Sequence, residues 1–344
     1  MDQPPDLTRV AVIGAGEHGS RHAREFPKVP GARLVGIYDL RRERAEALAQ
    51  ELGVLAFGDL GEALDAVEAA SIVVPATDHA GIARRAFDRG VDVLLEKPVT
   101  RTVEEANDLI ERAVAQIRIL QVGHVERFNP GVIAAHTATR DPVFFEVHRL
   151  GVFSPRSLDV DVVFDLMIHD LDLVLWMVKA EVADVRAVGL PVLSNRVDIA
   201  NARVEFHNGA VANFTASRVS TERVRKFRYF QPSEYISIDF ARRDAIAFSV
   251  DRNGPAPQIQ FRKLQPPATG LSGEQSGCDA SVDPLRTELA AFVGSVRTRR
   301  QPLVTGVEGR NALALAERVM ICIEAHAAQL HMPLGRSSGQ SGEL

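Results

Sequence analysis

In the first third of the chain, short apolar runs alternate with segments that have the 3.6-residue period of amphipathic helices. Five expected strands lie within residues 8–14, 32–40, 69–77, 91–98 and 117–125, and the clearest helices between them fill 41–52, 79–90 and 102–115. One of these helices should begin at Thr102, because Glu105 three residues later completes a capping box. This alternation predicts a doubly wound parallel sheet over about residues 7–123.

After residue 123 the helical period gives way to consecutive strand-like segments. They fill residues 143–153, 201–220, 223–231, 234–240 and 245–250. Asn208-Gly209 and the stretch 241–244 are typical hairpin turns between them. Helices are expected at 165–179, 284–298 and 309–329. We therefore predict an N-terminal doubly wound α/β domain (1–123) and a mostly antiparallel α+β domain (124–332), whose last helix could pack on the first domain. A Gly- and Ser-rich tail (333–344) is expected to be disordered.

Composition narrows the possible classes of protein. The 344 residues are enough for two domains, and 40 basic against 45 acidic residues give a net charge of −5. This charge disfavours non-specific nucleic-acid binding. Two cysteines supply no disulfide framework, and neither a signal peptide nor an apolar run of about 18 residues is evident. A cytoplasmic location is expected.

The first strand leads into a glycine-rich turn and then a helix. Gly14, Gly16 and Gly19 form the pattern G-x-G-x-x-G, in which the glycines allow a tight turn, a close approach of backbone to pyrophosphate, and close packing of helix on strand. The strand-turn-helix context makes a purely structural glycine turn the weaker alternative. We predict a dinucleotide site here.

Asp39 ends the next strand, 20 residues after Gly19, where an acidic residue can accept a hydrogen bond from a ribose hydroxyl. Its carboxylate would repel a 2′-phosphate, so NAD is favoured over NADP. Arg41 and Arg42 follow it and could bind that phosphate, or simply form the solvated face of a helix.

Ligands of a doubly wound sheet bind beyond the carboxyl ends of its strands. Three such ends carry polar residues, at 75–79, 96–98 and 123–129. Pro98 favours an extended Lys97, which would aim the ammonium off the strand tip. The alternative is an exposed Glu96–Lys97 pair that contributes little to stability.

The expected helix 165–179 carries a second constellation. Asp165 and His169 are four residues apart, on one helix face, where a carboxylate can orient the ring and raise its basicity. A metal site is the alternative, but the spacing of a zinc-binding helix is absent and Asp170 and Asp172 do not share that face. We therefore predict no metal.

With these motifs in place, the chain resembles the Gfo/Idh/MocA oxidoreductase family. The resemblance spans residues 9 to about 330 and is carried by GAGEHG, VPATDHAGIARRAFDRGVDVLLEKPVT, VGHVERFNP and DLMIHDLDL. It implies a Rossmann fold in the first domain and a large open sheet in the second. That sheet is expected to pack against another subunit, hence a homodimer or homotetramer. The resemblance also implies catalytic roles for Lys97, Asp165 and His169. The predicted cofactor contacts are Gly14, Gly16, Glu17, His18, Gly19, Asp39, Pro75, Thr77, His79, Glu96 and Lys97.

A narrower resemblance, carried by GHVERFNP and by residues 149–173 and 213–240, is to a group of this family that oxidises UDP-N-acetylglucosamine to its 3-keto form. That group supplies a sugar aminotransferase, which leads to a diamino sugar for lipid A. Asp161 stands where this group is expected to have glycine. Predicted substrate contacts are His124, Arg127, Asn129, Arg149 and Arg156; pairing of the arginines with acids such as Asp159 and Asp161 is the alternative.

Two other functions remain open at the level of the sequence. One keeps the fold and changes the substrate to a free sugar or inositol. The other is a non-catalytic NAD-binding regulatory protein, which the joint presence of Lys97, Asp165 and His169 disfavours.

Overall fold

The computed structural model describes residues 7–153, 160–251, 258–267, 283–332 and 334, and the chain forms two compact units. The first unit contains the described residues up to Phe128 together with 283–310, and the second contains the remainder. The helix expected at 284–298 therefore belongs to the first unit. Among the described residues, no helix combines the length and apolar character needed to span a bilayer. The predicted C-terminal tail lies almost entirely outside the described residues.

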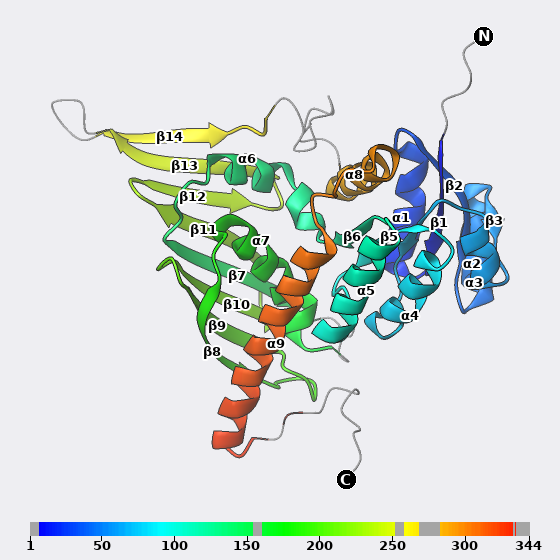
Figure 1. Ribbon diagram of the computed structural model, residues 1–344. Coiled ribbons are helices and arrows are strands. Elements are labelled where there is room, and N and C mark those ends of the chain that lie inside the picture. The colour runs from blue at the N-terminus through cyan, green and yellow to red at the C-terminus, as the bar shows by residue number, and fades with distance from the viewer. Residues whose placement is uncertain (1–6, 154–159, 252–257, 268–282, 333, 335–344) are drawn as a thin grey trace. The chain divides into compact units, whose positions relative to one another are not determined.

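The first unit is built on a six-stranded parallel sheet in the order β3-β2-β1-β4-β5-β6 (Figure 1). Its strands are β1 (Thr8–Ile13), β2 (Ala32–Tyr38), β3 (Leu55–Ala56), β4 (Ala69–Ile72), β5 (Asp92–Glu96) and β6 (Leu120–Gly123). Its helices are α1 (Glu17–Glu25), α2 (Arg42–Leu52), α3 (Leu60–Asp65), α4 (Ala76–Phe87), α5 (Val103–Ala115) and α8 (Pro284–Thr298), with short turns η1 (Phe26–Lys28) and η2 (Val125–Phe128). This strand order is that of the dinucleotide-binding fold and confirms the predicted doubly wound sheet.

Local signals in the sequence set several helix ends. Thr102 caps α5 by accepting a hydrogen bond from the Glu105 backbone, as predicted, while the Glu105 side chain accepts one from the Arg101 backbone instead of closing the capping box on Thr102. Gly90 has a φ of +71° after α4, a conformation that only glycine adopts readily. The cap signals therefore placed the helix start correctly but not every bond of the motif.

The second unit is built on an eight-stranded sheet in the order β14-β13-β12-β11-β7-β10-β9-β8. The strands are β7 (Phe144–Val152), β8 (Val182–Leu190), β9 (Ile199–Phe206), β10 (Val211–Ser220), β11 (Val224–Gln231), β12 (Glu234–Asp239), β13 (Asp244–Asp251) and β14 (Gln258–Leu264). Among the described strand pairs of this sheet, only β7–β10 is parallel, which confirms a mostly antiparallel open sheet. Gly209, with a φ of +85°, sits in the β9–β10 hairpin as its Asn-Gly sequence predicts.

Helices α6 (Pro130–Ala138) and α7 (Ile168–Val178) cover one face of this sheet (Figure 1). Strand side chains alternate between this covered face and the opposite one, so that Phe145 is fully buried while its neighbour Phe144 is only partly covered. The last helix, α9 (Gly306–Gln329), adds Leu315, Val319 and Ile323 to the same core. The prediction missed β3 and α3 in the first unit, and α6, β8 and β14 in the second.

A buried carboxyl group lies in the core of the first unit. Glu288 of α8 is fully buried, and neither side-chain oxygen has a hydrogen-bond partner in the part of the chain that the structure describes. Burial, and secondarily the charge of Glu96, raises the pKa of Glu288 well above its ordinary value. The folded chain therefore keeps a proton on Glu288 that the unfolded chain releases above pH 4.5.

The free energy of unfolding should consequently fall as the pH rises from 4.5 towards the folded pKa of Glu288, by about 1.4 kcal/mol per pH unit from this group. Glu288→Gln removes the titration, so urea denaturation should show the variant gaining stability relative to wild type across that window. The control Glu62→Gln changes a carboxylate exposed on α3. A stability difference between Glu288→Gln and wild type that does not vary with pH would contradict the interpretation.

Candidate active site

The glycine-rich turn has the shape that its sequence predicts. Gly14 has a φ of +105°, and a Cβ there would lie 2.2 Å from the Val73 carbonyl oxygen. A Cβ on Gly19 would lie 1.8 Å from the Gly14 carbonyl oxygen, so the turn and α1 pack in direct backbone contact. A Cβ on Gly16 would meet nothing within 4 Å. Contacts within the protein therefore do not require glycine at position 16. The open space beside it fits a pyrophosphate at the N-terminus of α1.

Asp39 lies directly beyond β2 and is tied to this turn. Its two carboxylate oxygens accept hydrogen bonds from the backbone of Ala15 at 2.6 Å and of Arg41 at 2.8 Å. A carboxylate has lone pairs left for ribose hydroxyls, so the residues present fit NAD. Arg42 makes an exposed ion pair with Glu46 at 2.7 Å, which supports the solvated-face alternative for that arginine.

The remaining predicted cofactor contacts lie at the same carboxyl edge of the sheet. Glu17 and His18 are exposed in the first turn of α1, while Pro75 and Thr77 are exposed at the start of α4. His79, one turn further into α4, is 1% exposed. Its ring nitrogens lie 2.9 Å from the Pro98 carbonyl oxygen and 3.0 Å from that of Val74. A contact of His79 with the cofactor stays a prediction.

Glu96 and Lys97 form the tip of β5, and both are partly buried. Glu96 Oε1 lies 3.2 Å from Nε2 of the fully buried His22, whose Nδ1 is 2.9 Å from the hydroxyl of Ser71. Burial alone would raise the pKa of Glu96, but His22, with His18 and Lys97, outweighs it and brings the pKa to about 2. The carboxylate of Glu96 is therefore held in place by His22. This differs from the alternative, in which Glu96 and Lys97 form only an exposed ion pair. Sequence reasoning did not single out His22, because it lies 74 residues from Glu96.

Arg127 and His124, predicted to contact substrate, follow β6 and are each 1% exposed. Arg127 forms an ion pair with Glu308 at 3.3 Å, and Glu308 in turn accepts hydrogen bonds from the backbone and hydroxyl of Thr305, both at 2.6 Å. The ion pair with Glu308 thus supports the alternative that Arg127 pairs with an acidic residue. Asp159, one of the acids named for that role, lies outside the described residues.

Asn129 and Arg149 in the second unit also have structural partners. Asn129 caps α6 through a 3.0 Å bond from the Gly131 backbone and donates to the Phe240 carbonyl at 3.3 Å. Arg149 forms a buried bidentate pair with Asp170, at 2.8 and 2.7 Å. Substrate binding by either residue stays a prediction. Arg156 lies outside the described residues.

The predicted catalytic residues are divided between the two units, Lys97 in the first and Asp165 and His169 in the second. The helix expected at 165–179 begins as a π-turn, η3 (Val163–Met167), and continues as α7. Asp165 therefore lies in the π-turn and His169 in the first turn of α7, both partly exposed. Such π-turns occur often at functional sites.

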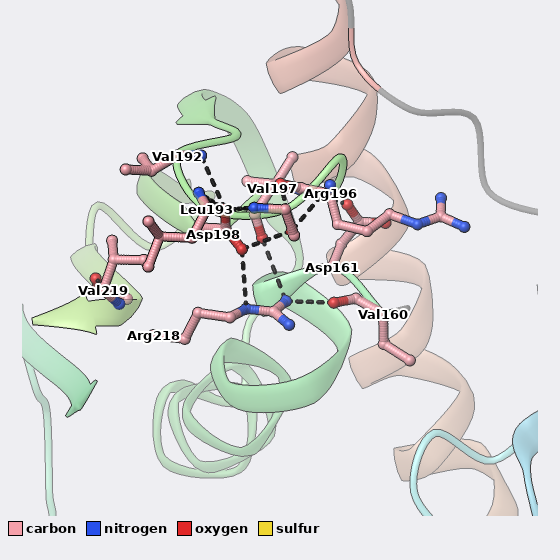
Figure 2. Close-up of polar contacts among 11 residues, drawn as sticks. Val160, Asp161, Val192, Leu193, Arg196, Val197, Asp198, Arg218 and Val219 are labelled. Carbon is pink, nitrogen blue, oxygen red and sulfur yellow. Dashed lines mark hydrogen bonds and ion pairs between the residues drawn. The ribbon is translucent and has the colours of Figure 1, made fainter. Parts of the chain in front are cut away.

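A buried polar cluster fixes the start of this π-turn (Figure 2). The Asp161 carbonyl accepts hydrogen bonds from the backbones of Phe164 and Asp165 at 3.0 and 3.1 Å, and its side chain accepts one from Val197 at 2.9 Å. Asp161 thus ties the Asp165 turn to the segment that leads into β9. This structural role accounts for an aspartate where glycine was expected.

Arg218 and Asp198 complete the cluster. Asp198 is fully buried and accepts backbone hydrogen bonds from Val192, Leu193 and Ser194 at 2.7–2.8 Å. Burial alone would raise the pKa of Asp198, but these donors outweigh it and hold the pKa below its usual value. Arg218 lies 3.5 Å from Asp198 and donates to the Val160 carbonyl, next to Asp161.

Arg218→Met should lower the free energy of unfolding by roughly 3 kcal/mol, because it leaves a buried carboxylate without its cation. Urea denaturation measures this loss. The control Arg186→Met breaks a pair whose side chains are 83% and 51% exposed, and should cost less than about 1 kcal/mol. Equal losses for both variants would show that the buried pair does not hold this region.

Two family models match consecutive parts of the chain. The oxidoreductase family with an NAD-binding Rossmann fold, GFO_IDH_MocA, matches residues 8–124, and the GFO/IDH/MocA C-terminal domain matches residues 132–230. These ranges cover the glycine-rich turn, the tip of β5, the π-turn and α7.

Full-length relatives agree with both matches. UDP-N-acetylglucosamine 3-dehydrogenase of Acidithiobacillus ferrooxidans is 37% identical over 318 residues, covering 92% of this chain and 97% of the relative. Its solved structure aligns over 93% of this chain and 98% of its own, with a TM-score of 0.83 and 36% identity. The scyllo-inositol 2-dehydrogenase (NAD(+)) of Bacillus subtilis is 32% identical over 242 residues, 62% of this chain and 68% of the relative. The chain thus belongs to the Gfo/Idh/MocA family of NAD-dependent oxidoreductases.

Proposed function

We propose that this protein oxidises the 3-hydroxyl of the sugar in UDP-N-acetylglucosamine, with NAD as the oxidant. The observation that carries this proposal is the 37% identity to a dehydrogenase of that substrate over nearly the full length of both chains. The chain also retains Lys97 at the tip of β5 and the Asp165–His169 pair.

In the proposed mechanism each of these side chains has a defined role. His169 takes the proton of the reacting hydroxyl as general base, and the Lys97 ammonium donates a hydrogen bond to the same oxygen. Asp165 orients the His169 ring or holds the sugar. NAD, when bound, supplies the hydride acceptor. One such donor to a developing oxyanion is commonly worth about 100-fold or more in rate.

The ketone product defines the next reaction. A 3-keto sugar is a substrate for transamination, so we propose that the product passes to a sugar aminotransferase and so to a diamino sugar for lipid A. Removal of the ketone by transamination would also draw the oxidation forward.

The test is near-UV detection of NADH after mixing the protein with NAD, UDP-N-acetylglucosamine, an aminotransferase and an amino donor. Signal is expected with the UDP-sugar and not with N-acetylglucosamine or inositol. Lys97→Met, which replaces the ammonium with an uncharged chain of similar length, should leave NAD binding largely intact but lose about 100-fold or more in kcat.

Each arm of this experiment can contradict a separate part of the proposal. Turnover of inositol without the UDP-sugar would favour the activity of the inositol relatives. Absence of signal with every UDP-sugar would refute the substrate class. Near wild-type turnover by Lys97→Met would refute the role of Lys97.

We further propose that the uncovered face of the eight-stranded sheet binds a second copy of this chain. Phe144, Phe230, Tyr235, Phe248 and Phe261 form a ladder of directly opposed aromatic residues across β7, β11, β12, β13 and β14, with successive ring centroids 4.8–5.8 Å apart. The same face exposes Ile259 and Phe261, each 68% accessible. A continuous apolar patch of this kind is typical of an interface.

The double variant Phe230→Ser/Phe261→Ser should shift the protein towards the monomer, because it removes apolar area both from within the ladder and from its end on β14. Light scattering coupled to size-exclusion chromatography measures the mass. Leu55→Ser removes a comparably exposed leucine of the first unit, 59% accessible, and should leave the mass unchanged. A wild-type monomer, or a double variant with the wild-type mass, would contradict this interface.

A further inference from the structure

Two buried histidines contact the chain on either side of Lys97. One reaches Glu96, the residue before it, from α1, and the other reaches Pro98, the residue after it, from α4. Both rings are at most 1% exposed. Neither ring can move without disturbing the close-packed core around it. Each ring can therefore hold in place the part of the strand tip that it contacts.

His22 fixes the Glu96 side. Its Nε2 contacts the Glu96 carboxylate at 3.2 Å, while its Nδ1 contacts the Ser71 hydroxyl of β4 at 2.9 Å. The other carboxylate oxygen of Glu96 accepts the Lys97 backbone N–H at 3.2 Å. A Cβ at Gly123 would lie 2.7 Å from Glu96 Oε1, so the glycine leaves the space that this carboxylate fills. Ser71, His22, Glu96 and the Lys97 backbone thus form one continuous chain of polar contacts.

His79 fixes the Pro98 side. Its Nδ1 faces two carbonyl oxygens, of Pro98 at 2.9 Å and of Val99 at 3.3 Å, whereas its Nε2 faces only that of Val74 at 3.0 Å. Burial lowers the pKa of His79 more than the carbonyl contacts and the charge of Glu96 raise it. A proton on Nδ1 satisfies more of the surrounding acceptors than one on Nε2.

We propose that His22 and His79 are positioning residues for Lys97: the Nε2 edge of His22 holds Glu96, and the Nδ1–H of His79 holds Pro98. Neither ring contacts the reacting atoms in this scheme. Together they fix the backbone from which the Lys97 ammonium projects. This inference rests on the proposed role of Lys97, and a displacement of about 1 Å at a reacting group can cost about 100-fold in rate.

The two rings present opposite edges to the Lys97 segment, and this allows a crossed substitution test. An asparagine amide can replace the Nδ1 edge of histidine, and a glutamine amide can replace the Nε2 edge. His79→Asn therefore keeps the Pro98 contact and His79→Gln keeps only the Val74 contact. For His22 the assignment is reversed, because His22→Gln keeps the Glu96 contact and His22→Asn keeps only the Ser71 contact.

The order of kcat should consequently reverse between the two positions. We expect His79→Asn to exceed His79→Gln, and His22→Gln to exceed His22→Asn, by about 10-fold or more in each pair, with kcat measured at saturating NAD. Ser71→Ala removes the hydroxyl that His22 Nδ1 contacts and should reduce kcat less than His22→Asn does. His207→Gln changes an exposed histidine of the second unit and should match wild type. NAD affinity and the midpoint of thermal unfolding are measured for every variant.

A merely structural role predicts a different result. In that case kcat would follow the unfolding midpoint, and the Asn and Gln variants would rank in the same order at both positions or be equal; either outcome overturns the inference. Lys97→Met separates this failure from that of the proposed function. If Lys97→Met loses turnover and the crossed order is absent, only the histidine inference is wrong. If Lys97→Met keeps turnover, the role of Lys97 is wrong and the histidine inference falls with it.

Discussion

A carboxylate removed from water must be paired, because its desolvation costs several kcal/mol that only a cation or several hydrogen-bond donors can offset. Both units of this protein place carboxylates at such positions near their predicted functional residues. Glu96 is held by His22, Asp170 by Arg149, and Asp198 by Arg218 with three backbone N–H groups. In each case the partner comes from a different element of the fold, so pairing the charge also fixes two elements against each other.

This constraint determines the local geometry of the candidate active site. The tip of β5 carries a lysine whose flanking residues are held from α1 and α4, and the π-turn that carries Asp165 is held from the start of β9 through Asp161. Proton transfer and oxyanion stabilisation depend on distances of about 3 Å, so supports of this kind are what the proposed chemistry requires. Glu288 is the contrasting case, since it meets the same cost by keeping its proton.

The second unit uses its sheet in two ways. The covered face carries the helices and the large core, including Phe145, Phe227 and Tyr229. The other face carries the aromatic ladder, in which Phe144 and Phe230 are the immediate sequence neighbours of the core residues Phe145 and Tyr229. Because strand side chains alternate, a run such as Phe144-Phe145 supplies both the core and a candidate subunit interface.

The sequence predicted what local physics controls. Strand and helix periods gave the doubly wound sheet, glycine spacing gave the dinucleotide turn, and Asn208-Gly209 gave a hairpin. Two of the missed strands lack a clean alternation of buried and exposed residues: β14 buries only Leu264, and β8 has exposed apolar residues at Val188 and Leu190. The π-turn could not be predicted from the sequence either, because Asp165 and His169 have the four-residue spacing of an ordinary α-helix.

The residue types at the predicted site could likewise be predicted from the sequence, because EKP and D-x-x-x-H are local patterns. The residues that hold this site in place could not. His22 lies 74 residues from Glu96, Arg127 lies 181 residues from Glu308, and Asp161 lies 36 residues from Val197. The sequence by itself determined which groups are available for chemistry. Only the tertiary structure decided which buried partner holds each of them. The pairing of a buried charge depends on proximity in space, and it produces no periodic pattern in the sequence.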